Sequence, residues 1–346
     1  MTTPSPPGEL LSWAISALGA ADSSQSPDLA VVAGDASNRR YYRATLAGKS
    51  HVLVSAPPAT EKNREFLAVR KLLAEAGVRV PELYAADLER GYLLLEDLGD
   101  RLMLPELAVA TADASYQLAT GVLLRMAAIE TQDLQLPPYN EDLLTEELGR
   151  FPTWFVQTLL GQELSAAEQA MLEALSARLV ASALEQPLVL VHRDFHSRNL
   201  MPQEEGGLAV IDFQDAVVGP VTYDLVSLLR DCYVRWPREQ VRHWALAHRD
   251  ALQARGMLGD VDAQCFLHWF DLMGLQRHIK VLGTFARLYL RDAKPAYLED
   301  LPLVIDYVLE IAGLYAPQEP ELAAFHQWFK SRLSPVIAQQ PWSATQ

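Results

Sequence analysis

The chain has 346 residues, of which 50% are hydrophobic, and it carries a formal net charge of −15 at pH 7. This length suits about two domains with a substantial core. The acidic balance disfavours nucleic acids and anionic membranes as partners, because both bind basic surfaces. No apolar run of about eighteen residues appears, and residues 1–8 lack the basic start and apolar core of a signal peptide, so we expect a cytoplasmic protein. We also expect a monomer.

The only cysteines, Cys232 and Cys265, both lie in apolar segments with helical character. In a cytoplasmic protein this pattern favours two reduced core thiols over a disulfide or a metal site.

The N-terminal part of the chain alternates between helical and strand patterns. Residues 8–20 have apolar positions at helical spacing and are followed by a polar linker at residues 22–28. Residues 61–76 have a second helical stripe, with Gly77 placed to cap it. Between them we expect a three-stranded antiparallel set, with Gly34 and Gly48 at its turns, over residues 29–33, 41–46 and 51–55.

A further strand at residues 92–96 leads into a hinge near residues 96–99, and the rest of the chain has mainly helical periodicity. We therefore predict an α+β, two-lobed fold in which residues 1–98 form a small sheet-rich lobe and residues 99–346 form a larger helical lobe. The predicted helices of the second lobe cover residues 115–130, 142–160, 165–184, 223–233, 238–255, 262–290, 301–314 and 320–333, interrupted by two strands at residues 188–191 and 209–211.

Polar residues that follow the first of these strands match a kinase catalytic loop. His192, Arg193 and Asp194 come directly after residues 188–191, and Asn199 lies five positions after Asp194 (199 minus 194). In the H-R-D-x-x-x-x-N pattern, the Asp orients the acceptor hydroxyl and the Asn holds Mg²⁺. Asp194 is therefore the candidate catalytic base, and Asn199 is a candidate metal ligand.

The second strand supplies another acid. Asp212 lies thirteen residues after Asn199 (212 minus 199), where a D-F-G-like motif would present a carboxylate to the metal. Mg²⁺ prefers oxygen ligands and keeps waters and phosphates, so one carboxylate and one amide suffice. A single Asp would be only a turn residue, but the two motifs together favour phosphoryl transfer. No long activation segment or A-P-E motif separates Gln214 from the helix at Tyr223, which favours a small-molecule acceptor.

Five segments carry a family resemblance: residues 34–43, 93–99, 192–199, 212–215 and 276–283. With them, the chain resembles the aminoglycoside phosphotransferase and choline kinase branch of the protein-kinase-like fold. Within that branch it is most similar to bacterial kinases that phosphorylate the anomeric hydroxyl of N-acetylmuramate and N-acetylglucosamine during peptidoglycan recycling.

The resemblance implies that ATP and Mg²⁺ are the cofactors, that Asp194 is the base, and that Asn199 and Asp212 bind the metal. It places adenine near the backbone of Glu96, Asp97 and Leu98. The phosphates would lie under a turn that is not a G-x-G-x-x-G loop and by itself reads as an ordinary hairpin, formed by Gly34, Asp35, Ala36, Ser37, Asn38 and Arg39. His196 and Gln214 are candidate substrate contacts, and His196 is at least as well explained by holding the loop.

One departure concerns the strand at residues 51–55, which has no lysine where many kinases place their phosphate-contacting amine. Lys62, Arg39 and Arg40 are the candidate replacements, although each also fits a solvated charge beside a turn, and no Glu of residues 61–76 is assigned as an ion-pair partner. For Asp224 we favour acceptance of hydrogen bonds from the catalytic-loop backbone over substrate contact.

The acceptor is suggested by residues 269–291, which hold five basic side chains and one acid, Asp271. This charge favours an acceptor with a carboxylate, such as N-acetylmuramate, and the alternative is a solvated helix face. Arg277 and Lys280, three positions apart, can point into one pocket. Trp154 and Trp269 are candidates for stacking on a sugar ring or for the core.

The leading hypothesis is ATP-dependent phosphorylation of an amino-sugar anomeric hydroxyl. Another small-molecule kinase of the same fold, acting on choline, an aminoglycoside or homoserine, is the first alternative. A catalytically inactive nucleotide-binding regulator stays open because of the missing strand lysine, although the intact Asp194, Asn199 and Asp212 argue against it.

Overall fold

The computed structural model describes residues 8–19, 29–34, 38–132, 134–204 and 206–343. The chain divides into two compact units, the first made of residues 1–103 and 198–215 and the second of residues 104–197 and 216–346. The first unit thus includes the segment that follows the catalytic loop. The predicted lobe boundary at residue 98 stays a prediction.

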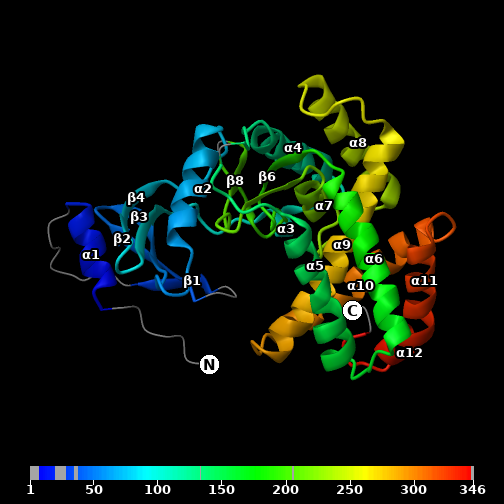
Figure 1. The fold of residues 1–346 in the computed structure, drawn as a ribbon. Helices are drawn as coiled ribbons and strands as arrows, with labels where there is room; N and C mark the ends of the chain where they lie inside the picture. Colours follow the sequence, from blue (N-terminus) through cyan, green and yellow to red (C-terminus); the bar gives the residue numbers. More distant parts are fainter. Residues whose placement is uncertain (1–7, 20–28, 35–37, 133, 205, 344–346) are drawn as a thin grey trace. The chain divides into compact units, whose positions relative to one another are not determined.

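The first unit is built on a five-stranded antiparallel sheet with strand order β1-β2-β3-β5-β4 (Figure 1). Strand β5 falls where the sequence predicted it, and β4, which has no β-branched residue, was not predicted. The elements of this unit are α1 (Leu10–Ala17), β1 (Ala30–Gly34), β2 (Arg40–Leu46), β3 (Lys49–Ser55), α2 (Asn63–Glu75), β4 (Leu83–Asp87), β5 (Tyr92–Glu96), β7 (Leu200–Pro202) and β8 (Leu208–Val210).

The core of this unit lies on both faces of the sheet, because strand side chains alternate between faces. Leu10 and Ala14 of α1 are fully buried against one face, together with Tyr42, Leu53 and Leu94 of the strands. Gly77 follows α2 with a φ of 73°, which confirms it as the residue that ends the helix in a left-handed conformation.

The hairpin β7–β8 also belongs to this unit. A bridge joins Arg79 to Ala209, and the Val210 amide donates to the Arg79 carbonyl over 2.8 Å. The Phe213 ring stacks on Phe66 of α2 with 4.8 Å between centroids. These contacts fix the residues on either side of the hairpin, Asn199 and Asp212, within the first unit.

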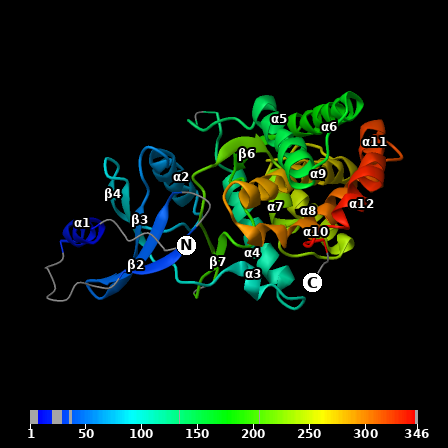
Figure 2. The same ribbon diagram turned by 90° about the horizontal axis from the view of Figure 1, so that it is seen from below.

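The second unit is mainly helical, as predicted, and α9 is its central element (Figure 2). Helix α9 packs against α5, α6, α7, α8 and α10. The elements are α3 (Met103–Glu106, at the boundary), α4 (Ala112–Ala127), α5 (Glu141–Arg150), η1 (Phe151–Leu159), α6 (Ala166–Leu184), β6 (Leu188–Val191), β9 (Val217–Pro220), α7 (Tyr223–Leu229), α8 (Arg238–Ala254), α9 (Ala263–Leu290), η2 (Pro295–Leu298), α10 (Leu301–Tyr315), α11 (Pro320–Trp328), η3 (Phe329–Leu333) and α12 (Ser334–Ile337).

Three expectations for residues 99–346 were wrong. Two strands were predicted between the helices, but each pairs with a further one, β6 with β9 and β7 with β8, because a strand needs a hydrogen-bonding neighbour. The helix predicted over residues 142–160 changes to a π-helix at Phe151, where Pro152 cannot donate to the helical ladder. Cys265 is exposed in the first turn of α9 rather than in the core, whereas Cys232 is buried and both thiols are free.

Gly283 shows how closely α9 approaches its neighbours. A Cβ at this position would lie 2.4 Å from the backbone carbon of Arg150, where α5 meets η1. Only a glycine permits this contact. The close approach fixes the position of α9 along its axis relative to α5. Within the described residues, no helix is long and apolar enough to cross a membrane.

Candidate active site

The catalytic loop begins where β6 ends in the second unit. Strand β6 pairs with β9, and β9 leads almost directly into α7. Asp224, in the first turn of α7, accepts hydrogen bonds from the backbone amides of His192 (2.6 Å) and Arg193 (3.0 Å). This confirms the predicted role of Asp224. Arg193 has a φ of 77°, a left-handed conformation that a side-chain-bearing residue adopts only when its surroundings hold it there.

A second aspartate holds the far end of the same loop. Asp231, just past the end of α7, accepts from the backbone amide of Ser197 over 2.9 Å and also from its hydroxyl. Sequence reasoning missed this residue. Asp231 lies seven positions after Asp224 (231 minus 224) and beyond the last helical residue, Leu229, so no helical periodicity relates the two acids.

Asp194 lies between these two anchors and is surrounded by cations of the second unit. Burial opposes ionisation, yet the positive charges of Lys280, Arg193 and Arg277 hold the pKa of Asp194 below its ordinary value. Asp194 is therefore a carboxylate at neutral pH, the form that can accept a hydrogen bond from an acceptor hydroxyl.

The solvated-face alternative is wrong for Arg277, His278 and Lys280, which are buried, whereas Arg291 at the end of the segment is exposed. Arg277 is 4% exposed and Lys280 is 8% exposed. The Arg277 guanidinium donates to the Cys232 thiol over 3.3 Å. The Lys280 ammonium lies 3.0 Å from a carboxylate oxygen of Glu147 and donates to the Tyr223 hydroxyl over 2.9 Å. Both charges act on Asp194, as expected for side chains that share one pocket.

The other predicted acceptor contacts are placed differently. The His196 ring meets Tyr233 edge-on at 5.4 Å, and burial lowers the pKa of His196, which favours the neutral ring. Trp269 is 8% exposed on α9 and belongs to the core of the second unit. Gln214 lies in the first unit, where its amide nitrogen donates to the Asp212 carboxylate over 2.8 Å.

The two candidate metal ligands lie on either side of the β7–β8 hairpin. Leu200 pairs with Val210, and the Ile211 amide donates to the Asn199 carbonyl over 3.1 Å. Asp212 has a φ of 65°, a left-handed conformation. The hairpin therefore places one amide residue, Asn199, and one carboxylate residue, Asp212, on its two neighbouring ends.

This donor set fits a hard cation. Amide and carboxylate oxygens are ligands that Mg²⁺ accepts, together with water and phosphate. Among the residues that the structure describes, no group of three or more His, Cys, Asp or Glu side chains could hold a metal by itself. A metal at Asn199 and Asp212 would therefore take water or phosphate oxygens for the rest of its coordination.

The predicted hinge residues are tied to the sheet through their side chains. The Glu96 carboxylate pairs with Arg79 and accepts from the Glu82 amide over 3.0 Å. Burial opposes its ionisation, but Arg79 holds its pKa below the ordinary value. Asp97 is bound by Arg43 through two hydrogen bonds of 2.7 and 2.9 Å. The Glu96 and Asp97 side chains are therefore occupied by arginine partners. A nucleotide contact at these residues would use their backbone, which is the contact that the sequence predicts.

The predicted phosphate-covering turn is described only at its edges. Gly34 ends β1, and Asp35, Ala36 and Ser37 lie outside the described residues. The Asn38 amide donates to a Glu61 oxygen over 2.9 Å.

Of the three candidate cations, Arg39 is the buried one, at 2% exposure. It forms a 3.7 Å ion pair with Glu61 and lies over the Phe66 ring. Glu61 lies two residues before the start of α2 at Asn63 and is the acidic partner that could not be assigned from sequence. The Lys62 ammonium pairs with Asp215 over 2.6 Å, and Arg40 donates to the Arg39 carbonyl over 3.0 Å.

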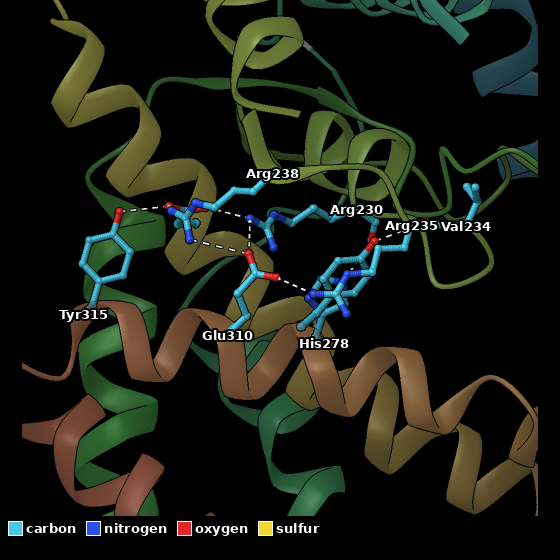
Figure 3. A network of polar contacts seen from close by, with 9 residues as sticks. Arg230, Val234, Arg235, Arg238, His278, Glu310 and Tyr315 are labelled. Atoms are coloured by element: carbon cyan, nitrogen blue, oxygen red, sulfur yellow. Dashed lines mark hydrogen bonds and ion pairs between the residues drawn. The ribbon is translucent and has the colours of Figure 1, made fainter. Parts of the chain in front are cut away.

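A buried ion network of the second unit includes Arg230, Arg238 and Glu310 (Figure 3). Arg230, which immediately precedes Asp231, pairs with Asp271 over 3.4 Å and with Glu310 over 3.3 Å. The Arg238 guanidinium and the Tyr315 hydroxyl also donate hydrogen bonds to the Asp271 carboxylate, each over 3.0 Å. The network joins the chain after α7 to α8, α9 and α10.

Comparison with protein families gives one domain match. The profile described as "Phosphotransferase enzyme family" matches residues 28–260, about two thirds of the chain. The matched segment includes the catalytic loop and the hairpin with Asn199 and Asp212, and the predicted family resemblance is confirmed.

Curated relatives support the same assignment. An N-acetylmuramate/N-acetylglucosamine kinase of Pseudomonas putida is 44% identical over 295 residues, covering 85% of this chain and 85% of its own length. Enzymes of the same name from Pseudomonas aeruginosa, 42% identical with 85% and 86% coverage, and Neisseria meningitidis, 37% identical with 85% and 88% coverage, also match.

Solved structures share the fold. An ethanolamine kinase of Plasmodium vivax superposes with a TM-score of 0.62 at 9% identity, covering 82% of each chain. An aminoglycoside phosphotransferase in complex with gentamicin has the same TM-score at 13% identity, covering 92% of this chain and 99% of its own. The predicted two-lobed, kinase-like fold class is confirmed.

Proposed function

Because the chain belongs to the phosphotransferase enzyme family, we propose that it uses ATP to phosphorylate the anomeric hydroxyl of N-acetylmuramate and N-acetylglucosamine. The observation that carries the proposal is the similarity to kinases of these two sugars, which reaches 44% identity and extends over 85% of both chains. This extent includes the elements that hold the candidate catalytic loop and the predicted acceptor residues. The sugar phosphates made would serve peptidoglycan recycling in the cytoplasm, where ATP is available.

In this proposal Asp194 orients the sugar hydroxyl and receives its proton. A carboxylate with a lowered pKa is a weak base, so proton transfer follows late and positioning provides most of the acceleration. Asp224 and Asp231 hold the two ends of the loop, which keeps Asp194 in place for an in-line approach.

Asn199 and Asp212 would hold Mg²⁺, which supplies charge neutralisation to the phosphates when bound. Gln214 would keep the Asp212 carboxylate oriented through its 2.8 Å hydrogen bond. Adenine would contact the backbone of residues 96–98, and the turn at residues 34–38 would cover the phosphates.

We assign Arg39 to the place of the missing strand lysine. It is buried and paired with Glu61, as the phosphate-contacting lysine of many kinases is paired with a helix glutamate. Lys62 is already paired with Asp215, and Arg40 donates to a backbone carbonyl.

Arg277 is the residue we propose for the acceptor carboxylate. Its recorded partner is the Cys232 thiol, and a thiol is only a weak acceptor, so an incoming carboxylate would form a stronger bond. His196 would lie beside the sugar as a neutral ring. Trp269, a core residue, and Lys280, which is paired with Glu147, remain predictions as acceptor contacts.

Release of ADP with Mg·ATP tests the proposal across N-acetylmuramate, N-acetylglucosamine, their reduced alditols, choline and kanamycin. We expect turnover with the two sugars and none with the alditols, which lack an anomeric hydroxyl. Turnover of the alditols would refute the anomeric acceptor, and turnover of the cations alone would refute the sugar assignment.

A further inference from the structure

Glu147 is a buried carboxylate that no sequence motif indicated. It lies on α5 and is 0% exposed, although charged carboxylates are rarely fully buried without partners. Its partners come from distant parts of the second unit: Arg193 of the catalytic loop, Lys280 of α9 at 3.0 Å, and the Tyr139 hydroxyl. A single residue of α5 thus connects the catalytic loop to the basic face of α9.

Glu147 alone does not balance the two cations that it contacts, and Asp194 is the next acid on which both of them act. Arg193 and Lys280 contribute two positive charges, and Glu147 and Asp194 contribute two negative ones. Burial opposes ionisation of Glu147, but Lys280 and Arg193 hold its pKa below the ordinary value, so it is a carboxylate. Loss of its charge would leave two buried cations drawn to Asp194 alone.

The geometry of the loop depends on the same contact. Arg193 stands directly before Asp194 and has the left-handed φ of 77°. Its backbone amide is held by Asp224 and its guanidinium by Glu147, with the Tyr139 ring 5.7 Å from that guanidinium. Backbone and side chain of one residue are therefore fixed from two helices, which leaves Asp194 little freedom to turn.

We propose that Glu147 is a positioning residue for phosphoryl transfer: it holds the side chains of Arg193 and Lys280 so that Asp194 keeps one orientation toward the acceptor. The proposal rests on the proposed function only in taking Asp194 as the base. Lys280 then acts as the partner of Glu147 rather than as a direct acceptor contact.

Other charged groups around Asp194 belong to the same environment and stay in place in the variants. They are Arg277 of α9, His192 and His196 of the loop, and Asp224 of α7. Glu147 contacts Arg193 and Lys280, and both of these cations act on Asp194, so a change at Glu147 reaches Asp194 through them.

The test compares Glu147→Gln with Glu146→Gln. Glu146 is the preceding residue on α5. It is exposed and forms an ion pair with Arg150. We expect Glu147→Gln to lower kcat about 10- to 100-fold with little change in either KM, because misplacement of a catalytic group affects the chemical step. Glu146→Gln should match the wild type.

A rescue experiment separates positioning from a purely structural role. The double variant Glu147→Gln, Lys280→Met removes one charge of each sign, which costs less than leaving a buried cation unpaired. We expect it to recover at least about threefold in kcat over Glu147→Gln. Lys280→Met alone should lower kcat less than Glu147→Gln does, since Glu147 keeps Arg193.

A readout without turnover uses the six lysines of the chain, labelled at Cε and titrated by NMR. Lys280, assigned by its loss in Lys280→Met, should titrate above its ordinary pH in the wild type and at a lower pH in Glu147→Gln, because Glu147 raises its pKa against burial.

Three results would overturn the proposal: Glu147→Gln with wild-type kcat, an effect confined to KM, or a double variant no better than the product of the two single ones. If Glu147→Gln does not fold, two other results overturn the proposal. One is a wild-type kcat in Lys280→Met, and the other is a Lys280 that titrates at its ordinary pH in the wild type. Absence of wild-type turnover with amino sugars would instead contradict the proposed function, and the lysine titration would still report on Glu147.

Discussion

Two buried carboxylates of the second unit, Glu147 and Asp271, have similar surroundings and different consequences. Glu147 is 0% exposed and Asp271 is 1% exposed, and each faces two cations and a tyrosine hydroxyl. The partners of Glu147 include Arg193 of the catalytic loop, whereas those of Asp271 are Arg230 and Arg238, which connect helices.

The two sites also differ in how well their charges are matched. Burial opposes ionisation of both acids, but the pKa of Glu147 is lowered and that of Asp271 is raised. Arg230 and Arg238 each divide their charge with Glu310, at 3.3 and 3.5 Å, so Asp271 receives less compensation. A carboxylate paired with two cations can therefore act on the catalytic loop or connect helices, and its partners decide which.

The largest expected effect lies on the catalytic side of this comparison. Asp194→Ala should lower kcat about 100-fold or more, since a positioned base contributes at least that much. Because the substitution also leaves buried cations with less compensation, kcat is measured by ADP release at temperatures where calorimetry shows the variant to be folded. Asp250→Ala, at an exposed position of α8, is the control. Near-normal turnover of Asp194→Ala would remove Asp194 from the role of base.

On the scaffold side, Asp271→Asn should lower the free energy of unfolding by about 3 kcal/mol, because it leaves Arg230 buried with less compensation. Its kcat should stay unchanged at temperatures where it is folded. Asp306→Asn is the matched control, since this acid pairs with Arg235 but is 58% exposed and contributes little. A loss of kcat with unchanged stability would make the two carboxylates equivalent.

A smaller effect is expected at Arg277. Arg277→Met should raise KM for N-acetylmuramate about tenfold and leave KM for N-acetylglucosamine nearly unchanged, because only the first sugar has a lactyl carboxylate to lose a charge-assisted hydrogen bond. Arg291→Met, at the exposed end of α9, should change neither constant. Equal losses for both sugars would contradict a carboxylate contact.

The smallest effect concerns pH. Burial raises the pKa of Asp224 to about 6. A group whose pKa is raised in the folded protein contributes stability that is fully present below its ordinary pKa, near pH 4. That stability is lost as the pH rises to about 6. The unfolding temperature of the wild type relative to Asp224→Asn should therefore decrease over this interval. A difference that is constant with pH would show that Asp224 is ionised throughout.

Local signals explain why much of the fold could be predicted. The helix predicted at residues 165–184 is observed as α6 at Ala166–Leu184, because Ser165 and Glu168 form a capping box. Asp262 caps α9 in the same way, through its hydrogen bond to the Cys265 amide. Strands β2 and β3 followed from their β-branched and aromatic residues, and β5 from its short apolar run.

What could not be predicted depends on contacts distant in sequence. Glu147 lies 46 positions from Arg193, and Asp231 lies 34 positions from Ser197, so neither pairing leaves a local pattern. The basic residues of α9 were visible, but whether they face solvent or the catalytic loop depends on the packing of α5 and α7 around that helix. Cys265 was misplaced because apolar neighbours do not show which face of a helix is buried.

The most direct test of the proposed reaction is the product itself. Incubation of the protein with Mg·ATP and N-acetylmuramate, followed by ³¹P NMR, should show a new phosphate resonance coupled to the anomeric proton of the sugar, formed in step with ADP. A phosphate coupled to any other sugar proton, or ADP formed only with inorganic phosphate, would contradict an anomeric kinase.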